Sequence, residues 1–503
     1  MSSPRGPGSR FAATRVLVVD TELPAPRLSQ HADRYGHAWV VIRRADRPRS
    51  LVEVDLGPDG VASRDHFATV FDRIRTADDL IGGIPVVADE LLPSLSVVIP
   101  TMAERLAALE ACLASIHTSG LPWVEILVVD NRPTVPVPDP LPGLVGQFRD
   151  ARVVRQSHPG IAAARNAGVA AATGDVVVFT DDDVQADPVW LRAMAGRFAL
   201  HPEETAVTGL VLPSELETPA QMWFERYYGG FAAERAFEPL TYRLARPDAS
   251  AWRRSTVVGQ DSDGRVVRRF AIYGAGACGA GCNMAFRRAA LRGRSPFDTA
   301  LGTGTPAQGG EDLAAIIGLL WNGGLLGFEP AALVYHQHRR DYPALRRQMR
   351  AYGAGFTAML TGLIARDPTH ALGVGAQLPR ALGRLATSTA VRLRGVRPAG
   401  DDHVAVPEDR DPHEIGDGDE SGRGYPAALT RDELGGLISG PVLYGRSRWA
   451  ERVRRQRSVL QAPVPGTTTA SVVLRRDRGP TAPRPPIQLT IATEPAASRR
   501  GQP

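Results

Sequence analysis

The chain has 503 residues, 43% of them apolar, and its formal net charge is only +5. This length predicts two or three folded units. The chain contains no lysine, and its arginines are scattered and do not alternate with aromatic residues, which argues against a nucleic-acid-binding protein. Three cysteines, Cys112, Cys278 and Cys282, cannot build a disulfide framework, and their spacing fits neither a zinc knuckle nor a redox CxxC pair.

The sequence lacks the signals of membrane insertion and secretion. No apolar run reaches the ~20 residues that span a bilayer, and residues 1–10 contain no apolar stretch of a secretion signal. We therefore expect a cytoplasmic protein with reduced cysteines.

A small α/β module is predicted for residues 15–90, after a disordered tail of residues 1–14. Its expected elements are three short strands at Arg15–Asp20, Ala38–Ile42 and Leu51–Leu56 and a helix at Ser63–Ala77. The sequence does not indicate a function for this module.

From Leu95 onward, strands and helices alternate, which predicts a parallel sheet covered by helices on both faces. The expected strands are LSVVIP, EILVVD, ARVVRQ and Val176–Thr180, and the expected helices are Glu104–Thr118 and the one that contains Ile161–Ala172. Ligands of such sheets bind beyond the carboxyl ends of the strands. Polar chemistry is therefore expected at one edge, where strands end in Pro100-Thr101, Asp130-Asn131 and Asp181.

The residues that follow are predicted to complete the site, and the chain after them is predicted to lie outside the catalytic domain. Residues 215–300 combine an aromatic helix, WFERYYGGF, with glycine-rich turns, and residues 311–322 form an apolar helix. The remaining expectations are a helical extension at 346–395, an acidic linker at 396–430, a basic helix at 431–460 and a disordered tail at 461–503.

Three consecutive carboxylates, Asp181, Asp182 and Asp183, follow a predicted buried strand. Adjacent like charges raise each other's pKa unless a cation neutralises them. Mg²⁺ and Mn²⁺ prefer carboxylate oxygen and often share their coordination with substrate phosphates. The cluster predicts a divalent-metal site that serves a diphosphate-bearing substrate. The alternative is a solvated helix cap, because Asp187-Pro188 and a helix follow.

Asp130 and Arg165 are candidates for contacts with a nucleotide. Asp130 ends a strand, where a carboxylate can accept hydrogen bonds from a ribose hydroxyl or a base N–H, although aspartate there is also a common turn residue. Arg165 lies beside Asn166 on a glycine-bounded helix. It can pair with a phosphate, with Asp181, or with a surface acid as an ordinary salt bridge.

Asp312 follows Gly309-Gly310-Glu311 and begins an otherwise apolar helix. It is either an acid that interacts favourably with the helix dipole or a general base that faces an acceptor hydroxyl. His336 and His338 follow the strand AALVY. A neutral imidazole there can complete a metal site or contact a diphosphate, and the alternative is a pair of surface histidines.

Five motifs occur in a fixed order, namely LSVVIPTMAERLAALEACLASI, EILVVDN, GIAAARNAG, VVVFTDDDV and GGEDL. In content, order and spacing they resemble the family 2 glycosyltransferases over about residues 94–345. The resemblance implies an α/β fold of the GT-A type, in which a Rossmann-like nucleotide-binding half joins an acceptor-binding half. It also implies a nucleoside-diphosphate sugar as co-substrate, Mn²⁺ or Mg²⁺ as cofactor, and inversion at the anomeric carbon.

The resemblance also implies a role for individual residues. Asp312 would be the base with Glu311 beside it, and Asp182 could replace either neighbouring aspartate as a ligand. Met102 stands where an aromatic residue is common. The implied donor contacts are Pro100, Thr101, Arg105, Asp130, Arg165 and Asp182, and the implied metal contacts are Asp181, Asp183 and His336.

The segments GAGCNMAFRR and WFERYYGGF resemble a bacterial branch of the family. That likeness implies an acceptor pocket with Asn283 and Trp223, roofed by the aromatic helix, for a glycan, a lipid-linked sugar or a small molecule. Glycine allows close backbone approach there.

The sequence thus predicts a metal-assisted, inverting glycosyltransferase of cell-envelope polysaccharide, glycolipid or secondary-metabolite synthesis. An inactive nucleotide-sugar-binding scaffold is the alternative. A nucleotidyltransferase would need a glycine-rich basic phosphate loop near its first strand, which IPTMAER is not. The arginine-rich segment Leu443–Leu460 is either a solvated helix or a peripheral contact with the inner face of the plasma membrane.

Overall fold

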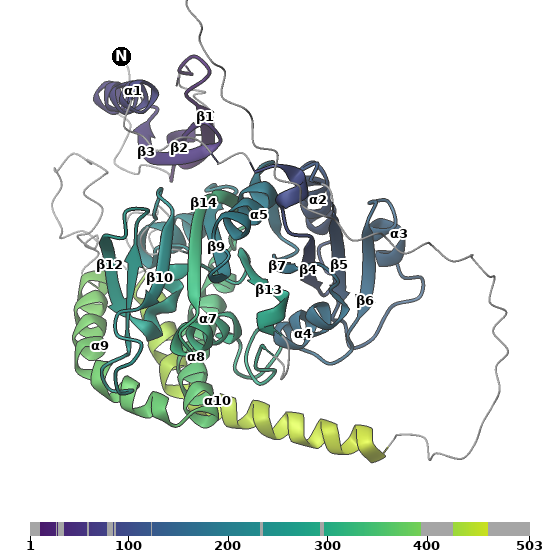
Figure 1. Cartoon of the computed structure of the whole chain (residues 1–503). Helices are drawn as coiled ribbons and strands as arrows, with labels where there is room; N and C mark the ends of the chain where they lie inside the picture. Colours follow the sequence, from purple (N-terminus) through teal and green to yellow (C-terminus); the bar gives the residue numbers. More distant parts are fainter. Residues whose placement is uncertain are drawn as a thin grey trace, which may run out of the picture. The chain divides into compact units, whose positions relative to one another are not determined.

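A computed structural model describes residues 11–26, 28, 35–57, 60–77, 84, 87–121, 123–231, 235–291, 296–393 and 426–460. The predicted tail at 461–503 lies outside the described residues, as do most of the predicted tail at 1–14 and most of the acidic linker at 396–430. The described part is a mixed α/β structure with a large central sheet and a helical C-terminal extension, which confirms the predicted fold class (Figure 1).

The N-terminal segment forms its own three-stranded sheet. Its elements are β1 (Ala13–Asp20), β2 (Tyr35–Arg44), β3 (Arg47–Asp55) and α1 (Val61–Thr76). Strand β1 pairs with β2 in parallel and β3 pairs with β2 in antiparallel orientation. The apolar face of α1, led by Phe67 and Phe71, buries the sheet residues Val40 and Ile42. The predicted strands and helix are confirmed, whereas the domain boundary at residue 90 remains a prediction.

The parallel half of the central sheet has the order β7-β4-β5-β6. Its strands are β4 (Leu95–Thr101), β5 (Val124–Asp130), β6 (Ala151–Arg155) and β7 (Val176–Phe179). The accompanying helices are η1 (Asp89–Leu91), α2 (Leu106–His117), α3 (Leu141–Val145), α4 (Ile161–Ala171) and α5 (Trp190–Leu200). Strands covered on both faces need continuous apolar runs, and every residue of β4 and β7 is buried.

The second half of the sheet contains strands that the sequence patterns did not indicate. They are β8 (Val184–Ala186), β9 (Glu204–Pro213), β10 (Leu240–Leu244), β11 (Thr256–Gln260), β12 (Val266–Ala271) and β13 (Met284–Arg287), and they join β14 (Leu325–His336). Short helical turns connect them, namely α6 (Pro219–Trp223), the π-helical turn η2 (Phe224–Tyr228), η3 (Ile272–Cys278) and η4 (Arg288–Leu291). Apart from β9, which has ten residues, the strands that were not indicated have three to six residues and carry too little periodicity to be recognised.

Four longer helices complete the described chain: α7 (Glu311–Trp321), α8 (Tyr342–Arg366), α9 (Thr369–Leu393) and α10 (Ala427–Leu460). A single helical stretch was expected where α8 and α9 occur. The break lies at Asp367, which is extended because Pro368 disfavours a helical residue before it. Among the described residues, no helix has both the length and the apolarity to cross a bilayer.

Helix α10 packs tightly against α8 because glycine lies at the contact. A Cβ on Gly436 would lie 2.2 Å from the carbonyl oxygen of Arg350, and one on Gly440 would lie 2.0 Å from Thr357 Oγ1. The Thr357 hydroxyl donates a hydrogen bond to the Leu437 carbonyl (2.8 Å). That carbonyl lacks its usual helical donor, since Pro441 follows four residues later without an N–H.

The tight contact makes Gly436 and its neighbour Gly435 a matched pair for mutagenesis. Gly436→Ala should destabilise the protein by about 1–3 kcal/mol, because the methyl group would force the helices apart. Gly435 has no atom near its would-be Cβ, so Gly435→Ala should be neutral or stabilising by up to ~1 kcal/mol through helix propensity. Thermal unfolding monitored by circular dichroism measures both, and equal melting temperatures would contradict the observed packing.

Candidate functional site

The carboxyl ends of three neighbouring strands lie together, as the alternation pattern predicted. Thr101 at the end of β4 stands opposite Asp130 at the end of β5 in the parallel register. The amide of Thr180, just after β7, donates to the Val98 carbonyl of β4 (3.2 Å). The acidic run Asp181–Asp183 therefore begins beside the last residues of β4.

The acidic run is surrounded by groups that compensate its charge. The Thr101 hydroxyl donates to Asp182 (2.6 Å). The Arg105 guanidinium lies against two carboxylates, with Nη2 2.9 Å from Asp182 and Nη1 2.7 Å from Asp183. The Arg105 side chain is 38% exposed, so it reaches these carboxylates from the solvent side.

Arg165 is a buried cation that joins the two acidic segments. Its Nη1 donates to Glu311 at the start of α7 (2.6 Å), and its Nη2 donates to Asp181 and to the Gly281 carbonyl, both at 3.2 Å. The side chain is 2% exposed. A buried guanidinium needs such partners, because an uncompensated charge in the interior is costly. The sequence left three partners open for Arg165: a phosphate, Asp181 or a surface acid. The structure shows the pair with Asp181.

Asp181, Asp183 and His336 form a compact group that could hold a metal ion. One potential ligand atom from each lies within 4.8 Å of the others. Burial raises the pKa of Asp181 to about 6, against the effect of Arg165, and the neighbouring aspartates add to the increase. Although burial favours the neutral form of Asp183, His336 and Arg105 hold its pKa below the ordinary value. Two carboxylates and an imidazole are a donor set that suits Mn²⁺ or Mg²⁺.

His336 and His338, at and after the end of β14, are both buried. His336 Nε2 lies 3.4 Å from Asp183, and its ring packs on Phe231 with centroids 4.5 Å apart. Burial lowers the pKa of His336 to about 4, so the ring is neutral at physiological pH, as metal coordination requires. His338 Nε2 pairs with Glu225 (2.6 Å), which also pairs with Arg235.

Asp312 approaches the same group from α7. Its Oδ2 accepts the Gly281 amide (2.9 Å), and its Oδ1 accepts the Leu313 amide (2.8 Å). A Cβ on Gly281 would lie 2.7 Å from Asp312 Oδ2 and 3.0 Å from Arg165, so only glycine allows these side chains to converge here. Glu311 is buried, and burial together with the charge of Asp312 raises its pKa to about 7.

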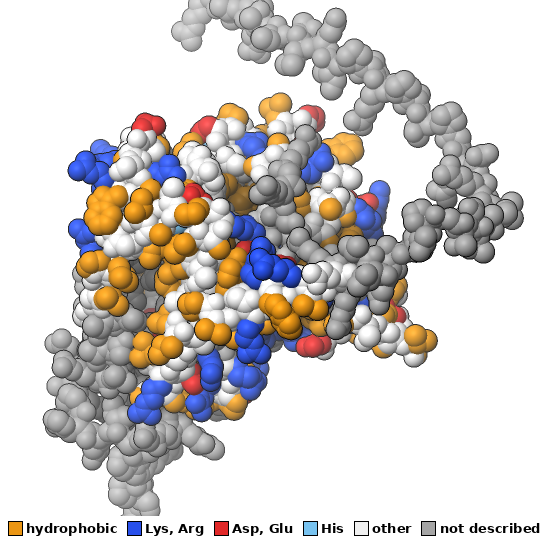
Figure 2. Space-filling view, turned by 90° about the horizontal axis from the view of Figure 1, so that it is seen from below, with side chains coloured by type: hydrophobic (Ala, Val, Ile, Leu, Met, Phe, Trp, Pro, Cys, Tyr) orange, Lys and Arg blue, Asp and Glu red, His pale blue; other side chains and the backbone are white. Residues whose placement is uncertain are grey.

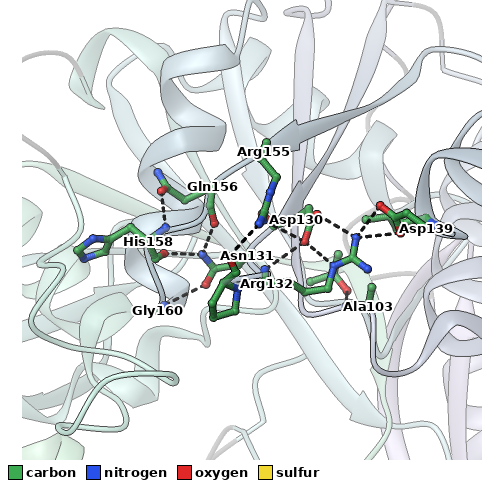
Figure 3. Close-up of polar contacts among 12 residues, drawn as sticks. Ala103, Asp130, Asn131, Arg132, Asp139, Arg155, Gln156, His158 and Gly160 are labelled. Atoms are coloured by element: carbon green, nitrogen blue, oxygen red, sulfur yellow. Dashed lines mark hydrogen bonds and ion pairs between the residues drawn. The ribbon is translucent and has the colours of Figure 1, made fainter. Parts of the chain in front are cut away.

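Asp130 has a partner that the sequence patterns did not reveal (Figure 3). Arg132, two residues later, donates to both Asp130 oxygens through Nε (2.8 Å) and Nη2 (2.9 Å), and the Arg132 amide donates to Oδ1. Arg132 Nη2 also reaches Asp139 at 3.0 Å. Arginine holds the pKa of Asp130 below its ordinary value although burial opposes this effect. The carboxylate is thus ionised, but Arg132 already occupies it.

Asn131 connects this strand end to the helix that bears Arg165. Its side-chain amide donates to the carbonyls of Gln156 and His158, and its oxygen accepts the amide of Gly160 (3.0 Å), the residue before α4 (Figure 3). Asparagine at a strand end signals only a turn, so this bridging role could not be read from the sequence.

The other predicted residues are core residues. Pro100 is a buried member of β4 opposite Val129. Trp223 is 7% exposed and packs edge-on against Tyr342. Asn283 is fully buried, and the protein uses its polar atoms: the amide donates to the carbonyls of Leu210 and Ala332, and the oxygen accepts Trp190 Nε1. Asn283 is thus out of reach of solvent and its amide group is already hydrogen-bonded within the core. This does not support the acceptor contact that was expected at Asn283.

Comparison with known proteins provides an independent view of the chain. Residues 96–293 match the family model described as Glycosyl transferase family 2. The pre-mycofactocin glycosyltransferase of Mycobacterium tuberculosis (strain H37Rv) is 30% identical over 230 residues, which are 45% of this chain and 41% of that protein. The match thus spans about two fifths of the relative.

Solved structures show weaker likeness. A mannosyltransferase from Pyrobaculum calidifontis in complex with GDP-Man and Mn²⁺ is 17% identical with a TM-score of 0.40, covering 75% of this chain and 96% of that chain. Glucosyl-3-phosphoglycerate synthase from Mycobacterium tuberculosis, solved with Mn²⁺, UDP and glucosyl-3-phosphoglycerate, is 20% identical with a TM-score of 0.34. That match covers 56% of this chain and 85% of that chain.

The structural role of Asn283 can be tested directly. Asn283→Ala should destabilise the protein by about 2–4 kcal/mol, because two buried carbonyls and the Trp190 indole N–H lose their partner. Asn322→Ala, at an exposed asparagine after α7, is the control and should change the melting temperature little. A variant of Asn283 with unchanged thermal stability would contradict this role and favour the acceptor contact expected from the sequence.

Proposed function

Because residues 96–293 carry a domain of the family 2 glycosyltransferases, we propose that this chain transfers a sugar from a nucleoside diphosphate to an acceptor hydroxyl. The observation that carries the proposal is the convergence of Asp181, Asp183 and His336 with the carboxylate of Asp312. Arg165 joins the two sides, because it donates to Asp181 and to Glu311, the residue before Asp312. The groups proposed to bind the donor diphosphate and the group proposed to activate the acceptor hydroxyl thus lie close together.

Asp181, Asp183 and His336 would hold Mn²⁺ or Mg²⁺. The donor set supports this assignment, and so does His336 Nδ1, a buried nitrogen without a hydrogen-bond partner in the described part of the chain. When bound, the metal neutralises negative charge on the leaving diphosphate. Asp182 would remain with Thr101 as an outer carboxylate that keeps the run in position.

The donor would lie at the ends of β4 and β5. Arg105, which is half-exposed and neutralises Asp182 and Asp183, is suited to turn towards the diphosphate when a cation replaces it. Asp130, still paired with Arg132, would accept hydrogen bonds from the nucleoside through its remaining lone pairs, which makes Arg132 an additional donor-site residue that positions this carboxylate. Arg165 would act through its buried pairs and position both acidic segments.

Asp312 would be the general base. Its two backbone hydrogen bonds fix the carboxylate, and each oxygen retains a lone pair for a proton. In the proposed step the acceptor oxygen bonds to the anomeric carbon, the bond from that carbon to the diphosphate oxygen breaks, and the hydroxyl proton passes to Asp312. A single displacement of this kind inverts the configuration. Glu311 would hold Arg165.

The acceptor side would involve the aromatic residues near β14. Phe224 packs with Tyr228, Phe231 and His338, and Phe231 contacts His336 of the proposed metal group. Trp223 packs in the same apolar cluster and contacts Tyr342, so it would hold the aromatic residues in position. We propose a glycan, a lipid-linked sugar or a small molecule of bacterial envelope or secondary metabolism as the acceptor, and a catalytic domain at about residues 94–345.

Removal of the proposed base should separate catalysis from donor binding. Asp312→Asn should lower kcat by about 10²–10⁴ while donor affinity stays within a few-fold, since the amide keeps the shape of the side chain, loses one of the two backbone hydrogen bonds and cannot take the proton. Asp65→Asn, on the exposed face of α1, is the control. The assay follows release of nucleoside diphosphate with candidate acceptors, and full turnover in Asp312→Asn would refute the assignment.

Donor and metal binding can be measured before an acceptor is known. Thermal unfolding is recorded with a panel of nucleoside diphosphates and sugar nucleotides, with and without Mn²⁺. A ligand at ~100 times its Kd stabilises the folded state by about 2.7 kcal/mol, so one base should raise the melting temperature only with metal. Asp183→Ala should abolish that shift.

The same titration addresses the scaffold alternative. A metal-dependent shift without transfer to any acceptor would favour an inactive sugar-nucleotide-binding scaffold, and no shift in a folded sample would contradict the donor site itself.

A further inference from the structure

Helix α10 lies outside the matched family segment and has two different faces. Its inner face holds the loop that leads to α7. The Tyr444 hydroxyl donates to Asp298 (3.1 Å), the Ser447 hydroxyl accepts the Ala307 amide (3.3 Å), and Glu451 accepts the Thr299 hydroxyl. These bonds fix the orientation of the helix, and therefore fix which of its side chains face away from the domain.

The outer face carries large apolar side chains in the solvent. Ile438 is 82% exposed, Val442 is 68% exposed and Trp449 is 69% exposed. Their spacings of four and seven residues place them on one side of a helix. Single exposed apolar residues are ordinary, but a row of three along one helix face is typical of a binding surface.

The charged residues of this helix are segregated in the same way. Arg431, Arg446, Arg448 and Arg452 are exposed, whereas all three acidic residues of α10, Asp432, Glu433 and Glu451, are half-buried or buried. Asp432 is paired with Arg346 on α8. Seen from below, the molecule shows arginine and apolar side chains side by side with few acidic ones (Figure 2). The outer face is thus apolar and cationic at once.

We propose that the outer face of α10, defined by Ile438, Val442, Trp449 and the flanking arginines, docks on an anionic lipid surface. Anionic lipid satisfies both features, because the apolar row can enter the boundary between headgroups and acyl chains while the arginines remain at the phosphates. Tryptophan is suited to this depth, since its ring is apolar and its N–H is polar. The α10 helix would lie flat and would not cross the bilayer.

Two other binding partners, a second copy of the chain and the acidic segment 401–420, fit the outer face of α10 less well. A second copy of the same face would place Arg446 and Arg452 against like charges in a symmetric contact. The acidic segment 401–420 has the complementary charge, but Val404, Val406 and Ile415 are its only large apolar residues. It therefore offers little cover for Ile438, Val442 and Trp449.

The test is flotation of the full chain with vesicles of phosphatidylcholine alone or with ~30% phosphatidylglycerol, a fraction chosen to give a negative surface potential. We expect binding only to the anionic vesicles, and weaker binding as salt rises. Val442→Glu should abolish flotation. Arg446→Gln together with Arg452→Gln should weaken it by about 5-fold per arginine.

Val61→Glu is the matched control, because Val61 is 55% exposed on α1 and the same substitution should leave flotation unchanged. Sedimentation velocity of each variant excludes unfolding and reports self-association. Equal flotation of Val442→Glu and the wild type, or no binding to anionic vesicles, would overturn the proposal. A concentration-dependent dimer that Val442→Glu disrupts, without vesicle binding, would assign the face to a second copy. These readouts are independent of sugar transfer.

Discussion

The structure depends on the compensation of negative charge at the end of β7. Asp181, Asp182 and Asp183 meet Glu311 and Asp312, so five carboxylates gather in a largely buried region. Arg165 and Arg105 supply the opposing charge within the protein, and Arg165 does so from a side chain with almost no access to water. A third cation at Asp181, Asp183 and His336 would complete the balance, which gives metal binding a physical reason beyond the motif itself.

Long-range contacts bring these charges together. The acidic run follows the parallel half of the sheet, His336 arrives on β14, and Glu311 and Asp312 arrive on α7, whose preceding loop is held by α10. Strand β14 also fixes the N-terminal sheet, since Glu329 pairs with the buried Arg47 of β3. One strand therefore links the N-terminal segment, the second half of the central sheet and the proposed metal group.

Local patterns predicted the parallel strands and the residues at their ends, because buried strands and the acidic run are continuous in sequence. They did not predict the partners. Arg132 on Asp130 and Glu225 on His338 are contacts set by turn geometry and by tertiary packing, which no periodicity encodes. Asn283 was expected at an acceptor pocket because its segment resembles a bacterial branch of the family. In the structure the core uses its polar atoms, and Gly209 on β9 allows the close approach, since a Cβ there would lie 2.5 Å from Asn283 Nδ2.

The place of β14 in the chain bears on how the molecule can be made. Strand β14 pairs in parallel with β9, more than a hundred residues earlier in the chain. Arg47 pairs with Glu329, which lies 282 residues later. Contacts of such separation form late and slowly. A chain emerging from the ribosome therefore carries its acidic run without His336 for roughly 150 residues of synthesis, and its first sheet without Glu329 for roughly 270. Those incomplete stages are when the nascent protein most needs protection from aggregation.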